Sequence, residues 1–206
     1  MPTERAHVAA VILAAGSSTR MGRNKLLLDL GGETLVRRAA RAAVGAGVDR
    51  VVVVLGHEEP RVRAELDGLP CTPVGNPDHA QGAGTSVRTG VRQVAADADA
   101  IVVVLADMPF VTAEMIATLV QRYRETGAPL VVSHYGDVQA PPTLYDRALF
   151  KELLSIPGER CAKQVVRRHE GEAVVVAWPE SALRDIDVPA DYEDARADLG
   201  GGQPLS

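Results

Sequence analysis

Two positively charged residues, Arg20 and Lys25, lie in a segment of small residues that could bind phosphate groups. The segment follows an apolar run, Val8–Ala14, and contains Gly16 and Gly22, which let the backbone turn tightly and approach a ligand. An arginine holds phosphate oxygens through two parallel hydrogen bonds, and a lysine acts on them as a point charge. We therefore expect a buried strand that leads into a loop around a nucleoside triphosphate.

Other phosphate-binding motifs do not fit this segment. A Walker loop has the pattern Gly-x-x-x-x-Gly-Lys-Ser/Thr, whereas here Gly16 and Gly22 are six positions apart and Arg23 follows the second glycine. The dinucleotide fingerprint Gly-x-Gly-x-x-Gly does not follow the apolar run. An ordinary basic surface loop after a core strand remains the alternative.

A carboxylate, Asp107, stands just beyond a second apolar run, Ile101–Leu105. A carboxylate in such surroundings is costly unless it is paired or bound to a metal ion, and Mg²⁺ takes one or two protein carboxylates and completes its shell with phosphates and water. Asp187 is a candidate for the second carboxylate, and we expect its neighbour Asp185 to belong to an edge strand or a helix cap. A turn aspartate is the alternative for Asp107.

A long loop of small residues, from Asn76 to Ser86, precedes a helical pattern. Glycines at positions 82 and 84 would let its backbone press against a flat ligand such as a base. The amides of Asn76 and Gln81 could read donors and acceptors on that base. An ordinary turn rich in Asn, Pro and Gly is the alternative.

Strand-like and helix-like patterns alternate along most of the chain, which predicts an α/β three-layer fold with a mostly parallel sheet. The ligand should then bind beyond the carboxyl ends of the strands, where the residues above are expected. The runs expected as strands are Val8–Ala14, Val51–Leu55, Ile101–Leu105, Leu130–Ser133 and Val174–Ala177. Helices are expected from a Thr34 cap to Ala46, over Ser86–Val94, after a Thr112 cap, over Arg147–Leu154, near Lys163 and from Pro189.

Composition limits the kind of protein. The chain has 206 residues, a net charge of −5 and 3% aromatic residues, so neither nucleic acid nor a membrane is expected as a partner. The two cysteines match no metal-binding spacing and the N-terminus has no signal-peptide pattern, which favours a cytoplasmic setting. We expect one domain over residues 1–206, with an ordered core at about 8–198 and a tail over 200–206.

The segment Leu13-Ala-Ala-Gly-Ser-Ser-Thr-Arg-Met-Gly-Arg-Asn-Lys25 resembles the signature loop of the nucleotidyltransferases of sugar-nucleotide and molybdenum-cofactor metabolism. Within that group the chain looks most like the MocA-like molybdenum cofactor cytidylyltransferases. The resemblance extends over about residues 8 to 198. It includes Asn76-Pro-Asp-His-Ala-Gln-Gly-Ala-Gly-Thr-Ser-Val-Arg88, Ala106-Asp-Met-Pro109, Leu144-Tyr-Asp-Arg-Ala-Leu-Phe150 and Asp185-Ile-Asp-Val-Pro-Ala-Asp-Tyr192.

This resemblance implies a Rossmann-like nucleotidyltransferase fold, Mg²⁺ and a nucleoside triphosphate. The resemblance implies that Arg20, Lys25 and Asp107 are catalytic, and that Asp107 and Asp187 bind the metal ion. Alanine at position 15, where guanylyl members tend to have glycine, favours CTP because its methyl group leaves less room for the base. The residues implied in nucleotide binding are Leu13, Ala14, Ala15, Gly16, Ser17, Ser18, Thr19, Arg20, Gly22, Lys25, Asn76, Gln81, Gly82, Gly84 and Ser86.

The implied reaction transfers CMP from CTP to a phosphorylated small molecule, with molybdopterin or the molybdenum cofactor as the favoured acceptor. A molybdoenzyme or a maturation factor would be a further partner. The chain departs from the subgroup at Ala140–Pro142 and at Gly158–Ala162, two segments on the acceptor side. Other acceptors, namely a sugar phosphate, methylerythritol phosphate or phosphocholine, therefore stay open, as do guanylyl transfer and a non-catalytic nucleotide-binding module.

Overall fold

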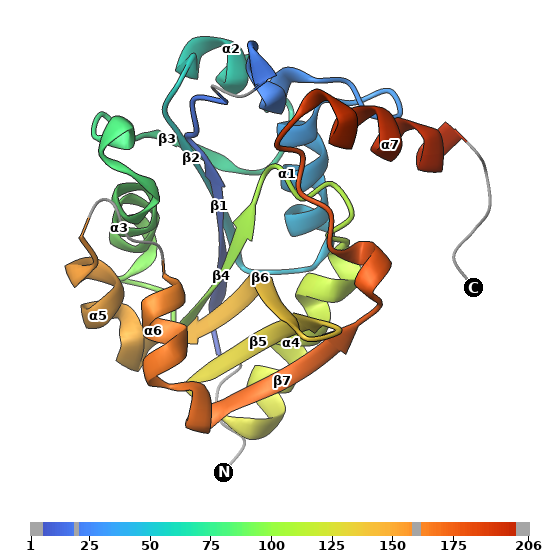
Figure 1. Ribbon diagram of the computed structural model, residues 1–206. Coiled ribbons are helices and arrows are strands. Elements are labelled where there is room, and N and C mark those ends of the chain that lie inside the picture. The colour runs from blue at the N-terminus through green and yellow to red at the C-terminus, as the bar shows by residue number, and fades with distance from the viewer. Residues whose placement is uncertain (1–5, 19–20, 158–161, 201–206) are drawn as a thin grey trace.

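The five apolar runs expected as strands all lie in one seven-stranded sheet (Figure 1). The computed structural model describes residues 6–18, 21–157 and 162–200. The order of the strands across the sheet is β3-β2-β1-β4-β6-β5-β7. The strands are β1 (Val8–Ala14), β2 (Arg50–Leu55), β3 (Thr72–Gly75), β4 (Ala100–Leu105), β5 (Leu130–Tyr135), β6 (Val138–Asp146) and β7 (Ala173–Trp178).

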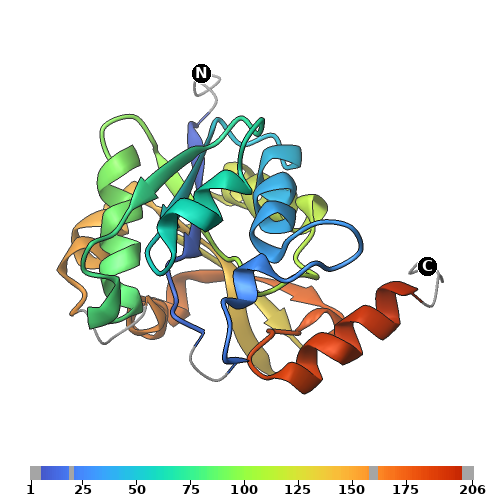
Figure 2. The ribbon, with the colours of Figure 1, turned by 90° about the horizontal axis from the view of Figure 1, so that it is seen from above.

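Helices cover both faces of this sheet, which gives the expected three layers (Figures 1 and 2). One face packs against α1, α2 and α4, and the other against α3, α5 and α6. The α-helices are α1 (Leu35–Gly45), α2 (Glu59–Ala64), α3 (Ala83–Val94), α4 (Ala113–Thr126), α5 (Phe150–Ser155), α6 (Lys163–Arg168) and α7 (Pro189–Gly200). The short 3-10 helices are η2 (Lys25–Leu27), η3 (His79–Gln81), η4 (Arg147–Leu149), η5 (Glu170–Glu172) and η6 (Glu180–Ala182).

The direction of the strands decides where a ligand can bind. β1 pairs in parallel with β2 and β4, and β2 pairs in parallel with β3. Among the named strands, only β6 is antiparallel to its neighbours, β4 and β5. The carboxyl ends of the four strands β1 to β4 therefore lie at the same end of the sheet, where ligands of parallel sheets bind.

Some elements differ from the sequence-based expectation. Two strands, β3 and β6, and the short helix α2 were not expected. Helix α3 begins three residues earlier than predicted, at Ala83. Thr112 caps α4 as predicted, since its hydroxyl accepts from the Met115 amide, but Thr34 forms no such bond and its hydroxyl donates to Glu65 instead. The segment around Asp185 is irregular rather than an edge strand.

The C-terminal helix α7 lies beside the start of α1 (Figure 1), and its Tyr192 and Ala195 pack in a small apolar cluster with Leu35 of α1. It extends through Gly200, the first residue of the expected tail, and residues 201–206 lie outside the described part of the chain. Within the described ranges, every helix is too short or too polar to cross a bilayer.

Candidate active site

Three charged side chains from distant parts of the chain meet at the carboxyl end of β4. The Lys25 ammonium lies 2.6 Å from Asp107 Oδ2 and 2.7 Å from Asp187 Oδ1. Asp107 lies two residues beyond the end of β4, Lys25 is the first residue of η2, and Asp187 belongs to the irregular segment before α7. The structure therefore brings together the lysine and both carboxylates that the sequence singled out, and it joins them by direct ion pairs.

The position of Asp187 is fixed by its neighbours. The Ile186 amide donates to the Asp107 carbonyl oxygen at 3.0 Å, and the Ile186 side chain is fully buried in a small apolar cluster. On the other side, the Asp191 carboxylate accepts from the amides of Asp187 and Val188, both at 2.8 Å. These bonds hold the segment before α7 against the end of β4, so that two residues far apart in the sequence share one site.

The charge balance of this group of three is negative. The Lys25 side chain is 12% exposed, against 24% for Asp107 and 30% for Asp187. Burial lowers the pKa of the Lys25 ammonium, but the charge and hydrogen bond of Asp107, followed by those of Asp187, outweigh burial and raise that pKa above its ordinary value. Lys25 is thus firmly protonated, and one positive charge faces two negative ones.

The loop after β1 folds back onto the start of η2. The Lys25 amide donates to the Ser18 hydroxyl at 3.1 Å, and the Met21 amide donates to the Ser18 carbonyl at 2.9 Å. Ser18 has a positive φ of 51°, a left-handed conformation that is uncommon for a residue other than glycine. Two of the predicted phosphate-binding residues, Thr19 and Arg20, lie outside the described residues, so their placement stays a prediction.

A hollow of about 580 Å³ lies beside this loop. The residues after β2, from His57 to Arg61, form its other wall, and Glu58 there also has a positive φ of 51°. Glu58 is paired with Arg61 across a helical turn, and the His57 carbonyl accepts from the buried Asn24 amide at 3.4 Å. The lining residues are Ser17, Ser18, Gly22, Arg23, Asn24, His57, Glu58 and Arg61.

The side chain of Asn76, which is expected to contact the base, makes hydrogen bonds within its own loop. Its side chain is buried, and the amide nitrogen donates to the hydroxyls of Thr85 at 2.8 Å and Ser86 at 3.0 Å. Its amide oxygen accepts from the Asp78 backbone at 3.1 Å, while the exposed Gln81 amide donates to the Asp78 carboxylate. These bonds give Asn76 and Ser86 a structural role in shaping the loop. Contact of this loop with a base stays a prediction.

The loop after β1 and the loop after β3 meet at Gly56, a residue that the sequence analysis did not single out. A methyl group at this position would lie 2.6 Å from His79 Cγ and 2.8 Å from the Ala15 carbonyl oxygen, so only glycine fits. The His57 amide also donates to the Ala15 carbonyl at 3.3 Å. A glycine directly after a strand was the signal that could have identified this position.

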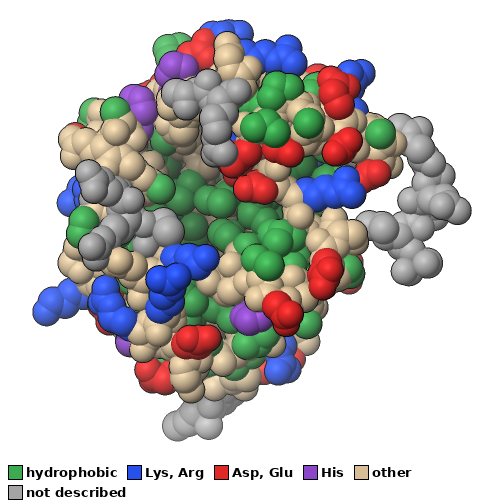
Figure 3. Space-filling view, viewed as in Figure 1, with side chains coloured by type: hydrophobic (Ala, Val, Ile, Leu, Met, Phe, Trp, Pro, Cys, Tyr) green, Lys and Arg blue, Asp and Glu red, His purple; other side chains and the backbone are tan. Residues whose placement is uncertain are grey.

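The face of the molecule that carries these loops is hollowed at its centre (Figure 3). The floor of the hollow is hydrophobic, acidic side chains gather on the rim over the segment that leads into α7, and basic side chains lie on the opposite side over α6 (Figure 3). Leu13 and Leu105, paired on β1 and β4, are partly exposed at the ends of their strands. A ligand with a negative charge and an apolar body would match these surroundings.

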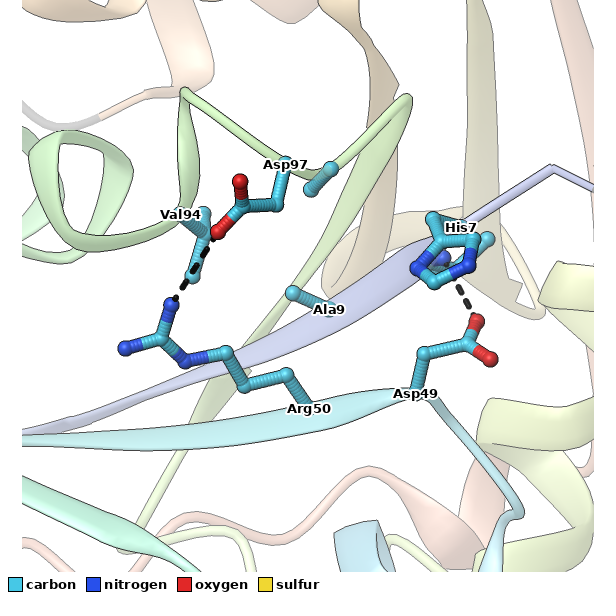
Figure 4. Close-up of a pocket in the computed structure, with 8 residues that line it drawn as sticks. His7, Ala9, Asp49, Arg50, Val94 and Asp97 are labelled. Atoms are coloured by element: carbon cyan, nitrogen blue, oxygen red, sulfur yellow. Dashed lines mark hydrogen bonds and ion pairs between the residues drawn. The ribbon is translucent and has the colours of Figure 1, made fainter.

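A smaller hollow of about 120 Å³ lies at the opposite end of the sheet. Figure 4 shows Arg50 facing Asp97 across it, at 3.8 Å, beside Ala9 on β1. Its lining residues come from the amino ends of β1 and β2 and from the end of α3 and the turn that follows it, whereas ligands of parallel sheets bind at the carboxyl ends of the strands. The two carboxylates near Lys25 are therefore the better candidate for a functional centre.

The two carboxylates also bear on the expected metal ion. Within residues 6–18, 21–157 and 162–200, no group of three or more His, Cys, Asp or Glu side chains could hold a metal ion. Mg²⁺ needs only one or two protein carboxylates when phosphates and water complete its shell. Asp107 and Asp187 already contact one cationic group together and remain partly open to solvent, so this pair fits Mg²⁺.

Comparison with known proteins gives a consistent picture. A family model described as the MobA-like NTP transferase domain matches residues 10–174. Purine catabolism protein PucB of Bacillus subtilis is 31% identical, with 92% of this chain and 96% of PucB aligned. A crystal structure of the Rv0371c homologue from Mycobacterium sp. strain JC1 has a TM-score of 0.82 at 28% identity and covers 96% of this chain and 99% of its own.

A manganese complex of Rv0371c from Mycobacterium tuberculosis H37Rv is also similar, with a TM-score of 0.75 at 26% identity over 92% of this chain and 97% of that one. Among bifunctional GlmU proteins that also match, this chain spans only 32% and 39% of the length of two. The matched family region ends at residue 174, before Asp187, so the second carboxylate is contributed by a segment outside it.

Proposed function

Because this chain is a nucleotidyltransferase that belongs to the MobA-like NTP transferase family, we propose that it transfers CMP from CTP to a phosphorylated small molecule and releases pyrophosphate. The favoured acceptor is molybdopterin or the molybdenum cofactor. The observation that carries the proposal is the direct contact of Lys25 with Asp107 and Asp187 at the carboxyl end of β4, beside the loop that follows β1.

The proposed reaction makes limited demands on the protein. An oxygen of the acceptor phosphate attacks the α-phosphorus of CTP, a new P–O bond forms, and the bond to the β-phosphate oxygen breaks as pyrophosphate leaves. The attacking oxygen is already an anion, so no general base is needed. Positioning and neutralisation of charge then supply the catalysis, and Lys25 would stabilise the negative charge on the departing pyrophosphate.

Asp107 and Asp187 would hold the Mg²⁺ ion. When bound, this ion would neutralise charge on the phosphates and help to align them. The manganese complex of Rv0371c supports a divalent cation in this group of proteins. The fit of the carboxylate pair to a Mg²⁺ ion that also binds phosphates supports the same assignment in this chain.

The nucleotide would lie between the loop after β1 and the loop after β3, which meet at Gly56. Alanine at position 15 supports CTP over GTP, since its methyl group narrows the space beside the loop. The basic side chains over α6, across the hollow from the acidic side chains on the rim, support an anionic acceptor (Figure 3). The apolar floor of the same hollow supports an acceptor whose body is largely uncharged.

The test is a comparison of the four nucleoside triphosphates in the presence of Mg²⁺. A ligand at about 100 times its dissociation constant stabilises the native state by about 2.7 kcal/mol, which corresponds to a rise of roughly 5–10 °C in melting temperature for a domain of this size. We expect this shift with CTP, and release of pyrophosphate once molybdopterin is added. A shift with GTP alone would overturn the assignment of CTP, and no shift with any of the four would overturn the nucleotide site.

Matched variants locate the chemistry within the site. Asp107→Asn and Asp187→Asn should each lower the rate of pyrophosphate release by at least about 100-fold, because each removes a charge that acts on the phosphates. Asp185→Asn is the control, because its side chain is exposed and lies outside the group of three. Full activity in Asp107→Asn would refute the role of the carboxylate pair.

A further inference from the structure

The Lys25 ammonium has two potential partners, a triphosphate and the pair of carboxylates, and it cannot bind both at once. Under the proposed function, on which this inference rests, the ammonium binds the triphosphate and the two carboxylates bind a divalent cation. In the structure the ammonium instead sits between the carboxylates, 2.6 Å from Asp107 Oδ2 and 2.7 Å from Asp187 Oδ1. The lysine therefore occupies the position of a cation in the carboxylate pair.

A metal ion and the ammonium would repel each other strongly there. Mg²⁺ binds carboxylate oxygens at 2.0–2.1 Å, so a metal ion that used these oxygens would overlap the ammonium. A metal ion that used the other oxygen of each carboxylate would still lie within a few ångströms of a positive charge whose side chain is only 12% exposed. Limited exposure weakens solvent screening, so the two cations compete for the pair.

We propose that Lys25 is an internal counter-cation that keeps the metal site closed until a triphosphate draws its ammonium away. The carboxylates are then released to the metal ion at the moment when phosphate oxygens are present to complete its shell. Metal ion and nucleotide consequently bind with positive cooperativity, since each favours the arrangement in which Lys25 has left the carboxylates. The same lysine also positions Asp187, because their ion pair ties the segment before α7 to the site.

The experiment measures Mn²⁺ binding to the full chain in the absence of nucleotide, by the electron paramagnetic resonance signal of free Mn²⁺. We expect Lys25→Met to bind Mn²⁺ at least ten times more tightly than the wild type, because the competing charge is gone. Lys151→Met removes the same charge from an exposed position on α5 and should match the wild type. Adding Asp187→Asn to Lys25→Met should abolish the gain, which would place the bound ion at the carboxylate pair.

Equal Mn²⁺ affinity in the wild type and in Lys25→Met would overturn the proposal, because the ammonium and the metal ion would then bind side by side. Lys25→Gln provides a second neutral variant, and thermal unfolding establishes that each variant is folded. If neither Lys25→Met nor Lys25→Gln folds, the test uses the wild type alone. The wild type should bind Mn²⁺ more tightly when inorganic triphosphate is present, and an unchanged affinity would refute the coupling. These measurements record metal binding and no catalytic turnover. The coupling can therefore be refuted while the proposed reaction holds, and the proposed reaction can be refuted while the coupling holds.

Discussion

Replacement of Gly56 by alanine tests whether the loops after β1 and β3, which we propose bind the nucleotide, are held at a fixed spacing. The added methyl group would lie 2.6 Å from His79 Cγ and 2.7 Å from His79 Cβ, and 2.8 Å from the Ala15 carbonyl oxygen. The imidazole could turn away, but the backbone fixes both the His79 Cβ atom and the Ala15 carbonyl, which continues β1. The loops after β1 and β3 must therefore separate, or β2 must shift at its end.

The expected loss of stability follows from two opposing terms. Overpacking of this kind costs about 1–3 kcal/mol, while alanine restricts the unfolded chain and returns about 0.4–1 kcal/mol. A net loss of about 1–2 kcal/mol should lower the melting temperature by roughly 2–8 °C in a chain of this length. The gain in melting temperature with CTP should also shrink, because the nucleotide would need both loops in place.

Urea unfolding of Gly56→Ala, Gly16→Ala, His79→Ala and the double variant Gly56→Ala with His79→Ala separates the contributions. Gly16→Ala adds the same methyl group where no heavy atom lies within 4 Å, so it should stay within about 0.5 kcal/mol of the wild type. His79→Ala combined with Gly56→Ala should recover the part of the loss due to the imidazole, leaving the part due to the Ala15 carbonyl and to the Cβ atom that alanine keeps at position 79. The coupling between the two sites should exceed about 0.5 kcal/mol. If Gly56→Ala is as stable as Gly16→Ala, or if the double variant shows no coupling, the fixed-spacing argument is wrong.

Two further predictions concern the attachment of surface elements. Tyr192→Phe removes the hydroxyl that donates to the Asp29 carbonyl at 2.6 Å, and should lower stability by about 0.5–1.5 kcal/mol, measured as a fall in thermal midpoint; an unchanged midpoint would contradict this. The carboxylates of Glu152 at 2.8 Å and Glu172 at 3.1 Å raise the pKa of His169 in the folded state. The protonated His169 contributes less than about 1 kcal/mol to stability, because its contacts with the two glutamates are partly open to solvent. This contribution is complete below the ordinary histidine pKa of about 6.5 and is lost as pH rises through the raised pKa of the folded state. The gap in urea midpoint between the wild type and His169→Gln should thus narrow as pH rises from the ordinary pKa through the raised pKa of His169, and a constant gap would refute the assignment.

The apolar runs predicted most of the fold, because a strand buried on both faces has an almost unbroken run of Val, Ile and Leu in the sequence. β1 was predicted over its full length, Val8–Ala14, and β2 and β4 to within one residue. β6 was missed because Pro141 and Pro142 lie within it, and proline normally argues against a strand. β3 was missed because it has only four residues, one of them glycine, too few for a periodic pattern.

The sequence predicted which residues belong to the candidate site, but not which of them contact one another. Lys25 was assigned to phosphates and the two aspartates to a metal ion, and nothing in their spacing indicates that the lysine pairs with both. Such contacts depend on where the segment before α7 returns to the sheet, which is a property of the tertiary fold. Asn76 shows the opposite case: a polar residue in a ligand-like loop whose hydrogen bonds are satisfied by its neighbours.

The pairing of Lys25 with Asp187 has a consequence for biosynthesis, because 162 positions separate the two residues. At about 5–20 residues per second, the ribosome needs roughly 10–30 s to produce the second after the first. During this interval β1, β2 and β4 can already assemble through shorter-range contacts, while the site still lacks one of its carboxylates. The pair of carboxylates around Lys25 is thus complete only once Asp187 has been synthesised, and a chain that stopped before this residue would lack one of the two.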